Sequence, residues 1–207
     1  MKLYTFAPSP NSLRVFAVAH ETGQNLEMVP VDLTKGEHMK PEFIKLNPNH
    51  KIPTLVDGDF VLWESTAIML YLAYKAGGKL IPTDPKPRAE MHQWISWNNA
   101  HFSPACMIFL YENMVKALLK IGDPDPKQLE KGEAEFARFG AVLNDHLKGR
   151  KHIVGNSSTI ADHHVFASLV HAGGCGLPVA KFPEIQRWCG EMAASAPWQK
   201  ALAVIKH

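Results

Sequence analysis

The sequence predicts an α/β domain followed by an all-helical domain. Three observations support this fold class in the 207-residue chain. In residues 1–77, apolar residues alternate with a period of two in some segments and recur at helical spacing in others. Residues 78–87 concentrate glycine and proline, which is typical of a linker. In residues 88–207 the long apolar patterns have helical spacing, so we expect the helical domain to cover this range.

The first domain begins with two strand–helix units. Residues 2–6 alternate as a strand does, and residues 11–22 carry apolar side chains at helical spacing before Gly23, a common helix stop. Residues 26–33 predict a second strand, and residues 41–46 predict a short helix that begins with proline.

A hairpin and a helix complete the first domain. Residues 54–56 and 60–62 are short apolar runs, and we expect Asp57-Gly58 to form the two-residue turn between them. Residues 65–76 then predict a helix. The resulting order, β-α-β-α-β-β-α, is that of the thioredoxin-like fold.

The second domain is predicted to consist of helices. The apolar pattern over residues 88–119 is too long for strands, and we expect Pro104 to kink this helix. Further helices are predicted at residues 129–147, 159–173 and 183–194.

Composition excludes several classes of protein. The formal net charge is +2 and the sequence pI is about 8.4, so nothing favours nucleic acid or an anionic membrane as a partner. The three cysteines, Cys106, Cys175 and Cys189, form no CxxC pair, which is typical of a chain kept reduced inside a cell. The chain opens directly into a strand, and no apolar run reaches the ~18 residues that span a bilayer. We therefore expect a cytoplasmic protein.

A proline corner and a helix start form the most informative motif. Lys51-Ile52-Pro53 opens the hairpin, and Glu64-Ser65 begins the helix after it. If the Ile52–Pro53 bond is cis, the backbone N–H and C=O of Ile52 turn outward and can pair with an extended peptide. The free N–H groups at the helix start favour a carboxylate. The motif predicts a site for a zwitterionic peptide, with a plain hairpin and capped helix as the structural alternative.

These residues resemble those of a known family. Lys-Ile-Pro at 51–53, Asp-Gly at 57–58 and Glu-Ser-Thr-Ala-Ile at 64–68 are similar to the glutathione-binding half of the cytosolic glutathione transferases. Residues 1–15 resemble that family's first strand, active-site loop and first helix, and residues 155–162 resemble its buried helix start. A serine in the loop, without Tyr or Cys, is similar to the serine-type theta, phi and delta classes, here expected in a bacterial member.

The resemblance implies that Ser9 holds the glutathione thiol as a thiolate. An unperturbed thiol, with a pKa of about 8.5, is only slightly ionised at neutral pH, and a hydroxyl donor favours its charged form. Ser9 precedes the first helix, where it could instead simply cap that helix. Asn11 and Ser12 are nearby hydrogen-bond donors, so either could face the sulfur in place of Ser9.

The resemblance assigns the rest of the glutathione site to six residues: His38, Lys51, Ile52, Pro53, Glu64 and Ser65. Ser65 would bind the α-carboxylate of the γ-glutamyl group, and Glu64 would face its α-ammonium. Ile52 would pair its backbone with the cysteinyl residue. Lys51, with His38 and Lys40 as further candidates, would supply positive charge for the glycyl carboxylate. Each of these side chains could otherwise be a capping or solvated residue.

The helical domain offers candidates for the second substrate. Phe102, Cys106 and Phe109 are implied as parts of an apolar electrophile pocket, although such a stripe is more often core. The histidines near residue 163 do not have the spacing of metal ligands, so no metal is expected. Thr159 and Asp162 instead predict a capping box.

The predicted function is conjugation of the glutathione thiolate to small apolar electrophiles, as in detoxification. Glutathione would be a co-substrate, with no further cofactor, and the family resemblance implies a homodimer. Two alternatives remain open: glutathione-dependent peroxide reduction or isomerisation by the same thiolate, and a non-catalytic binding or regulatory module.

Overall fold

The computed structural model describes residues 1–206, which form two compact units. The first contains residues 1–81 and the C-terminal segment that begins at Ser195, and the second is Pro82–Ala194. The sequence predicted that residues 88–207 all belong to the helical domain. In the structure the last helix, α11 (Ala196–Ala203), packs instead on α1 (Pro10–Thr22) of the first unit. Trp198 is fully buried there, and η5 (Val204–Lys206) follows.

The described residues of the first unit contain a four-stranded sheet. Its strands are β1 (Lys2–Thr5), β2 (Glu27–Pro30), β3 (Thr54–Asp57) and β4 (Phe60–Trp63), in the order β2-β1-β3-β4. β1 and β2 are parallel, and the other two pairs are antiparallel. This mixed sheet confirms the predicted thioredoxin-like fold.

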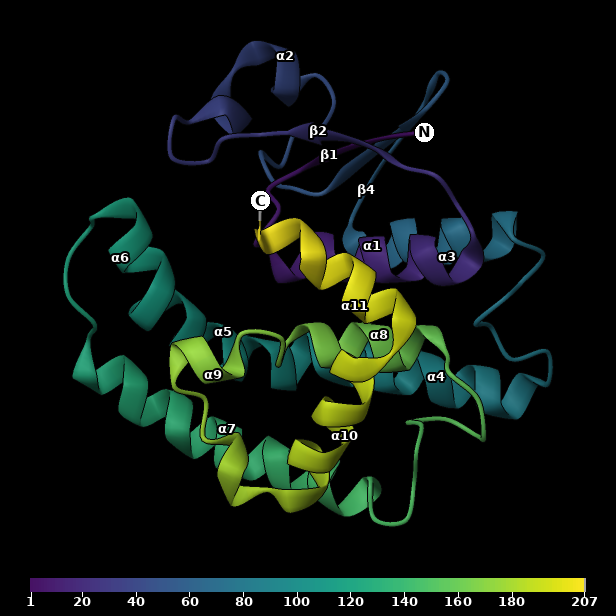
Figure 1. The fold of residues 1–207 in the computed structure, drawn as a ribbon. Helices are drawn as coiled ribbons and strands as arrows, with labels where there is room; N and C mark the ends of the chain where they lie inside the picture. The colour runs from purple at the N-terminus through teal and green to yellow at the C-terminus, as the bar shows by residue number, and fades with distance from the viewer. Residues whose placement is uncertain (207) are drawn as a thin grey trace. The chain divides into compact units, whose positions relative to one another are not determined.

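Helices cover both faces of this sheet (Figure 1). α1 and α3 (Ser65–Lys75) lie on one face, and η1 (Glu37–Met39) and α2 (Pro41–Ile44) lie on the other. Leu3 and Leu55, which pair across β1 and β3, are fully buried in the core. Tyr4, the next residue along β1, points to the opposite face and contacts Phe43 of α2.

The hairpin turn is shifted by one residue from the predicted Asp57-Gly58. Asp57 pairs with Phe60, so Gly58 and Asp59 are the two turn residues, and Gly58 has the positive φ of 66° that such a turn requires. The Asp57 carboxylate accepts hydrogen bonds from the Tyr71 hydroxyl (2.8 Å) and from the Lys75 ammonium group (2.7 Å). These two bonds tie the hairpin to α3.

All regular elements that the structure describes in the second unit are helices. These are α4 (Pro85–Trp97), η2 (Asn98–Phe102), α5 (Ser103–Leu110), η3 (Tyr111–Val115), α6 (Lys116–Leu119), α7 (Pro126–His146), α8 (Ile160–Ala167), α9 (Ala172–Cys175), η4 (Val179–Lys181) and α10 (Pro183–Ala194). η2 and η3 are π-helical. α4 begins inside the predicted linker because the Asp84 carboxylate caps it, accepting from the Lys86 N–H at 2.8 Å. Among the described residues, no helix is long and apolar enough to cross a membrane.

The predicted capping box at the start of α8 is confirmed. The Asp162 carboxylate accepts hydrogen bonds from the backbone N–H (2.9 Å) and the hydroxyl (3.1 Å) of Thr159. Its other oxygen accepts from the Ile153 N–H at 2.8 Å, which fastens the preceding loop. Asp162 therefore has a role in folding the second unit.

Candidate active site

The register of the sheet brings the predicted glutathione-binding segments to one edge of the first unit, which is the end of the sheet where β1, β2 and β4 finish and β3 begins. Tyr4 pairs with Thr54, and Thr54 pairs with Trp63. The loop after β1, which leads to Ser9, therefore leaves the sheet beside the corner before β3. Glu64 follows directly after β4 at the same edge. β2 runs parallel to β1, so the loop after β2 also leaves from this edge.

Ser9 lies at the N-terminus of α1 in an extended conformation, with φ −66° and ψ 125°. Its carbonyl accepts hydrogen bonds from the N–H groups of Ser12 and Leu13, both at 2.9 Å. Its hydroxyl makes no capping bond to α1 in the described structure, and Pro10, at the first helical position, has no N–H to satisfy. The hydroxyl is thus not used to cap the helix.

The two alternative donors on α1 differ in accessibility. Asn11 is half-buried, whereas Ser12 is fully buried. The Ser12 hydroxyl oxygen has no hydrogen-bond partner within the described residues. In this conformation a thiol at the surface could reach Ser9 or Asn11 but not Ser12.

The proline corner has the conformation that the sequence predicted. The Ile52–Pro53 bond is cis, and within residues 1–206 the Ile52 backbone N–H and C=O make no hydrogen bond. The buried side chain of Asn47 stabilises the corner, because its amide donates hydrogen bonds to the Lys51 carbonyl at 2.7 Å and to the Thr54 hydroxyl at 3.1 Å. Asn47 was not among the residues that the sequence predicted for the site, and its supporting role follows from these contacts alone.

The start of α3 combines an unusual backbone with a mostly buried serine. Glu64, the residue before the helix, has φ 69° and ψ 112°, and its exposed side chain makes no capping bond within the described chain. Ser65 is the first helical residue and is 7% exposed. Because the first N–H groups of a helix have no partners inside it, this end can accept an anionic group.

The loop after β2 is stiffened by Asp32. Its carboxylate accepts from the hydroxyl (2.6 Å) and N–H (2.9 Å) of Thr34, and it pairs with the Lys35 ammonium group at 3.1 Å. The hydrogen bonds from Thr34 and then from Lys35 lower the pKa of Asp32 to about 2. Glu37 accepts the Asp32 N–H at 2.8 Å, which closes the loop just before His38.

A second contact joins this loop to the proline corner. Nδ1 of His50 lies 3.3 Å from Sδ of Met39, so the segments that carry His38 and Lys51 are neighbours. Lys51 is exposed and forms no ion pair in the part of the chain that the structure describes. His38 is half-buried, and its Nδ1 lacks a hydrogen-bond partner among those residues. The Lys51 side chain is thus available to a ligand, whereas Nδ1 of His38 is buried in this conformation.

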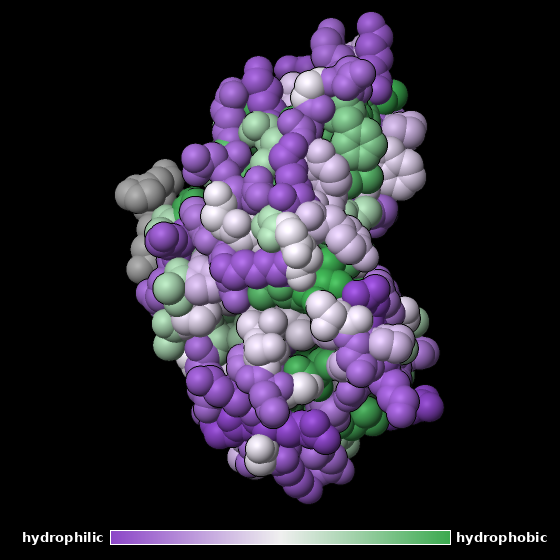
Figure 2. Space-filling model, turned by 90° about the vertical axis from the view of Figure 1, so that its right-hand side faces the viewer, coloured by the Kyte–Doolittle hydropathy of each residue, from purple (hydrophilic) through white to green (hydrophobic). Residues whose placement is uncertain are grey.

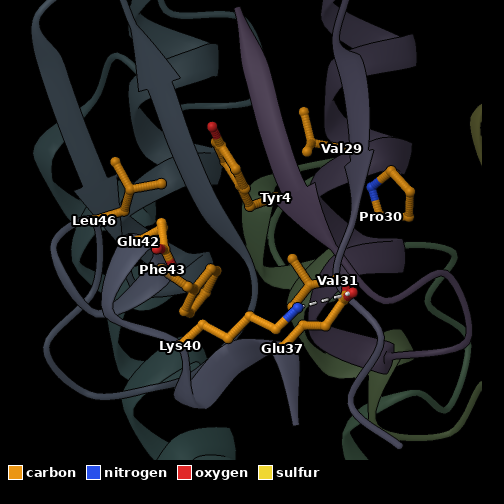
Figure 3. A pocket seen from close by; sticks show the side chains of 9 residues that line it. All are labelled: Tyr4, Val29, Pro30, Val31, Glu37, Lys40, Glu42, Phe43 and Leu46. Atoms are coloured by element: carbon orange, nitrogen blue, oxygen red, sulfur yellow. Dashed lines mark ion pairs between the residues drawn. The ribbon is translucent and has the colours of Figure 1, made fainter. Parts of the chain in front are cut away.

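Of the residues considered for the glutathione site, a pocket of about 220 Å³ on the α2 face of the sheet contains Lys40 alone (Figure 3). Val29, Val31 and Leu46 contribute apolar walls. The Lys40 ammonium group lies 3.6 Å from the Glu37 carboxylate beside it. The pocket offers none of the converging backbone and helix-end groups found at the sheet edge, and we assign it no role.

Phe102, Cys106 and Phe109 lie in the core of the second unit, with exposures of 0%, 0% and 3%. The Phe102 ring stacks on Trp97 at 5.2 Å between centroids, and both phenylalanines contact Phe136. Burial raises the pKa of the Cys106 thiol well above its usual value. With this little exposed surface, these side chains fit the core alternative better than an electrophile pocket.

The second unit does expose apolar side chains elsewhere. Tyr111 of η3 and Leu118 of α6 are 46% and 52% exposed, and Ile121, just beyond α6, is 53% exposed. The sequence pattern could not separate them from the buried stripe, because both have helical spacing.

Comparison with known proteins identifies the family. The sequence pattern described as glutathione S-transferase, N-terminal domain, matches residues 1–74, and that described as glutathione S-transferase, C-terminal domain, matches residues 100–196. The chain belongs to the glutathione S-transferase family. The predicted family, fold and enzyme class are thereby confirmed.

Individual members of the family match the chain over nearly its whole length. The Zea mays protein named Glutathione S-transferase 3 is 38% identical over 214 residues, spanning 99% of this chain and 94% of the relative. A structure of glutathione S-transferase III in apo form has a TM-score of 0.87 and 35% identity, and the match covers 98% of this chain and 95% of that one. A Pseudomonas fluorescens member with two glutathione bound has a TM-score of 0.85 and 29% identity over 97% and 91% of the two chains.

Proposed function

We propose that this transferase conjugates the thiolate of glutathione to small apolar electrophiles. The observation that carries the proposal is the convergence of Ser9, Ile52 and Glu64 at one edge of the sheet. Each segment there leaves a group unused within residues 1–206: a hydroxyl outside the helix cap, a free backbone N–H and C=O, and a free carboxylate. These groups are complementary to a thiolate, an extended peptide and an ammonium group.

In the proposed complex glutathione extends along this edge. The Ile52 backbone pairs with the cysteinyl residue, which directs the sulfur toward the Ser9 hydroxyl and the N-terminus of α1. Ser65 and the N-terminus of α3 hold the α-carboxylate, and Glu64 holds the α-ammonium. Lys51 attracts the glycyl carboxylate. Catalysis then consists of keeping the thiol ionised and positioned for attack.

Two measurements test this proposal. The protein should be retained on immobilised glutathione, and it should form a covalent glutathione adduct with at least one electrophile from a panel of aryl halides, epoxides and unsaturated carbonyl compounds. Retention without any adduct would favour the binding module, and failure of both would remove the proposed site altogether.

Glutathione-dependent peroxide reduction is the second candidate. In this reaction two glutathione thiols are oxidised to the disulfide while a hydroperoxide is reduced to an alcohol and water. The relative with two glutathione bound favours keeping this candidate. Mass spectrometry of the products separates the two reactions, because conjugation gives a thioether and peroxide reduction gives glutathione disulfide.

We also propose that the chain forms a homodimer through the β4 side of the first unit. β4 is an edge strand, and an exposed apolar edge favours association. Phe60 and Trp63 of β4 are 45% and 39% exposed, and Tyr74 of α3 is 58% exposed. On the face of the molecule drawn in Figure 2, hydrophobic residues reach the surface between hydrophilic ones. Light scattering should give twice the chain mass, and Trp63→Lys should halve it. Met28→Lys, on the opposite edge strand, is the control and should leave the mass unchanged.

A further inference from the structure

The side chain of Met39 connects the loop after β2 to the proline corner. Met39 is the last residue of η1, and its backbone N–H donates to the Gly36 carbonyl at 2.9 Å. Its Sδ atom lies 3.3 Å from Nδ1 of His50, eleven residues further along the chain. Because the sulfur of methionine can only accept a hydrogen bond, Nδ1 of His50 is the donor in this contact. One sulfur atom thus holds the two segments together.

His50 belongs to the corner on which glutathione is proposed to lie. Its φ of 57° is in the left-handed region, which residues with a Cβ atom adopt rarely, and its N–H donates to the Asn47 carbonyl at 3.0 Å. Lys51 and Ile52 follow it directly, and in the proposed complex they bind the glycyl carboxylate and the cysteinyl backbone. A displacement of His50 therefore displaces the backbone that binds glutathione.

The Met39 sulfur is accessible to an oxidant. Met39 is 55% exposed, more than any other methionine that the structure describes. A hydroperoxide converts such a thioether to the sulfoxide. The sulfur attacks the distal oxygen of the hydroperoxide, so an S–O bond forms, the O–O bond breaks, and the sulfur loses two electrons. The proton passes to the departing oxygen, which leaves as an alcohol, or as water when the oxidant is hydrogen peroxide.

Oxidation changes the contact with His50 whichever way the new oxygen points. A separation of 3.3 Å between Sδ and Nδ1 is direct contact, so an oxygen atom between them must push the two segments apart. An oxygen on any other side makes the sulfur partly positive, and it then no longer accepts a hydrogen bond from the ring. The flexible, apolar side chain also becomes polar.

We propose that Met39 is a site of reversible oxidation, at which conversion to the sulfoxide weakens glutathione binding by loosening the proline corner. This inference rests on the proposed function and adds regulation to the same site. The oxidant is a hydroperoxide, and enzymatic reduction of the sulfoxide restores the original contact.

Oxidation of the purified protein tests the inference. The protein is treated with hydrogen peroxide, separated from it so that glutathione itself is not oxidised, and titrated with glutathione by calorimetry. Peptide mass spectrometry should show one added oxygen on Met39. The Kd for glutathione should rise by about two- to tenfold, as for the loss of one contact between a sulfur and a ring. Methionine sulfoxide reductases of both stereospecificities should restore the original Kd.

Three variants assign the effect to this contact. Met39→Leu has a side chain of similar size without sulfur, so peroxide should leave its Kd unchanged. Met28→Leu, on β2, is the matched control: Met28 is 48% exposed, and this variant should respond to peroxide as the wild type does. His50→Gly removes the ring and tolerates the positive φ, so oxidation of Met39 should then change the Kd little.

The inference is overturned if Met39 resists oxidation, or if its sulfoxide forms and the Kd does not change. It is also overturned if Met39→Leu remains sensitive to peroxide, if Met28→Leu loses this sensitivity, or if the reductases do not restore the Kd. Failure of the proposed function gives a different result, in which the wild-type protein does not bind glutathione before any treatment, and this inference then fails with it.

Discussion

Removing the Ser9 hydroxyl should raise the pKa of the bound glutathione thiol. In the structure this hydroxyl makes no capping bond to α1 within the described residues, and Pro10 occupies the first helical position. Ser9→Ala therefore removes little from the fold, and its effect should be confined to the bound thiolate. Affinity for glutathione should barely change, because in the proposed complex the hydroxyl contacts the sulfur alone.

The size of the effect follows from one charge-assisted hydrogen bond. Such a bond contributes about 1.5–3 kcal/mol. This energy corresponds to a rise of about 1–2 units in the thiol pKa, since one unit is about 1.4 kcal/mol. At neutral pH the thiolate fraction, and with it the rate of conjugation, should then fall by about ten- to a hundredfold. A lost helix cap would instead lower the stability of the fold by about 1 kcal/mol.

The assay is a pH titration of the ultraviolet absorbance of the thiolate in the protein–glutathione complex. It is run on the wild type, on Ser9→Ala, and on Asn11→Ala and Ser12→Ala. Ser12 is the matched control, because its hydroxyl is on the same helix but fully buried. Thermal unfolding of each variant reports any loss of stability.

Two results would refute the reasoning about Ser9. If Ser9→Ala leaves the titration unmoved and Asn11→Ala or Ser12→Ala shifts it, the catalytic role passes to that residue. If Ser9→Ala instead lowers the unfolding temperature with no change in the titration, Ser9 is a helix cap. A titration that no variant moves would favour the binding module.

Three further predictions concern binding, packing and pH. Glu64→Ala or Ser65→Ala should raise the KM for glutathione more than it lowers kcat in steady-state kinetics, and unchanged KM values would contradict binding at the start of α3. Gly132→Ala should destabilise the second unit by about 1–3 kcal/mol in thermal unfolding, because its Cβ would lie 3.0 Å from atoms of α5 side chains, whereas Gly190→Ala, with nothing within 4 Å, should be neutral or stabilising. Asp32 has a pKa lowered from 3.8 to about 2, so its contribution to stability is present above pH 3.8 and is lost as the pH falls toward 2. In Asp32→Asn the unfolding temperature should lose the part of its fall between pH 3.8 and about 2 that comes from Asp32. A pH profile identical to that of the wild type would contradict this prediction.

Some elements followed from local sequence patterns, and others depended on contacts between distant residues. The order of strands and helices in residues 1–75 and the capping box at Thr159 were predicted correctly, because period, turn residues and caps are local signals. The turn at Gly58 was shifted by one residue, since strand pairing sets the register. The placement of Trp198 against α1 required the whole chain to be folded.

The candidate site also has features that followed from local sequence patterns and features that depended on contacts between distant residues. The sequence indicated Ile52 and Glu64 because they stand at a recognisable proline corner and helix start, and the family resemblance indicated Ser9, with Asn11 and Ser12 as alternatives. It could not tell that Phe102 is core, since a buried face and an exposed apolar face have the same helical spacing.

Only the tertiary structure brought the indicated residues to one sheet edge, through the pairing of β1, β3 and β4. It also revealed that Arg14 of α1 is buried, with Nε and Nη1 unpartnered among residues 1–206. Burial and charge pairing are properties of residues far apart in the chain, so no local pattern in the sequence encodes them.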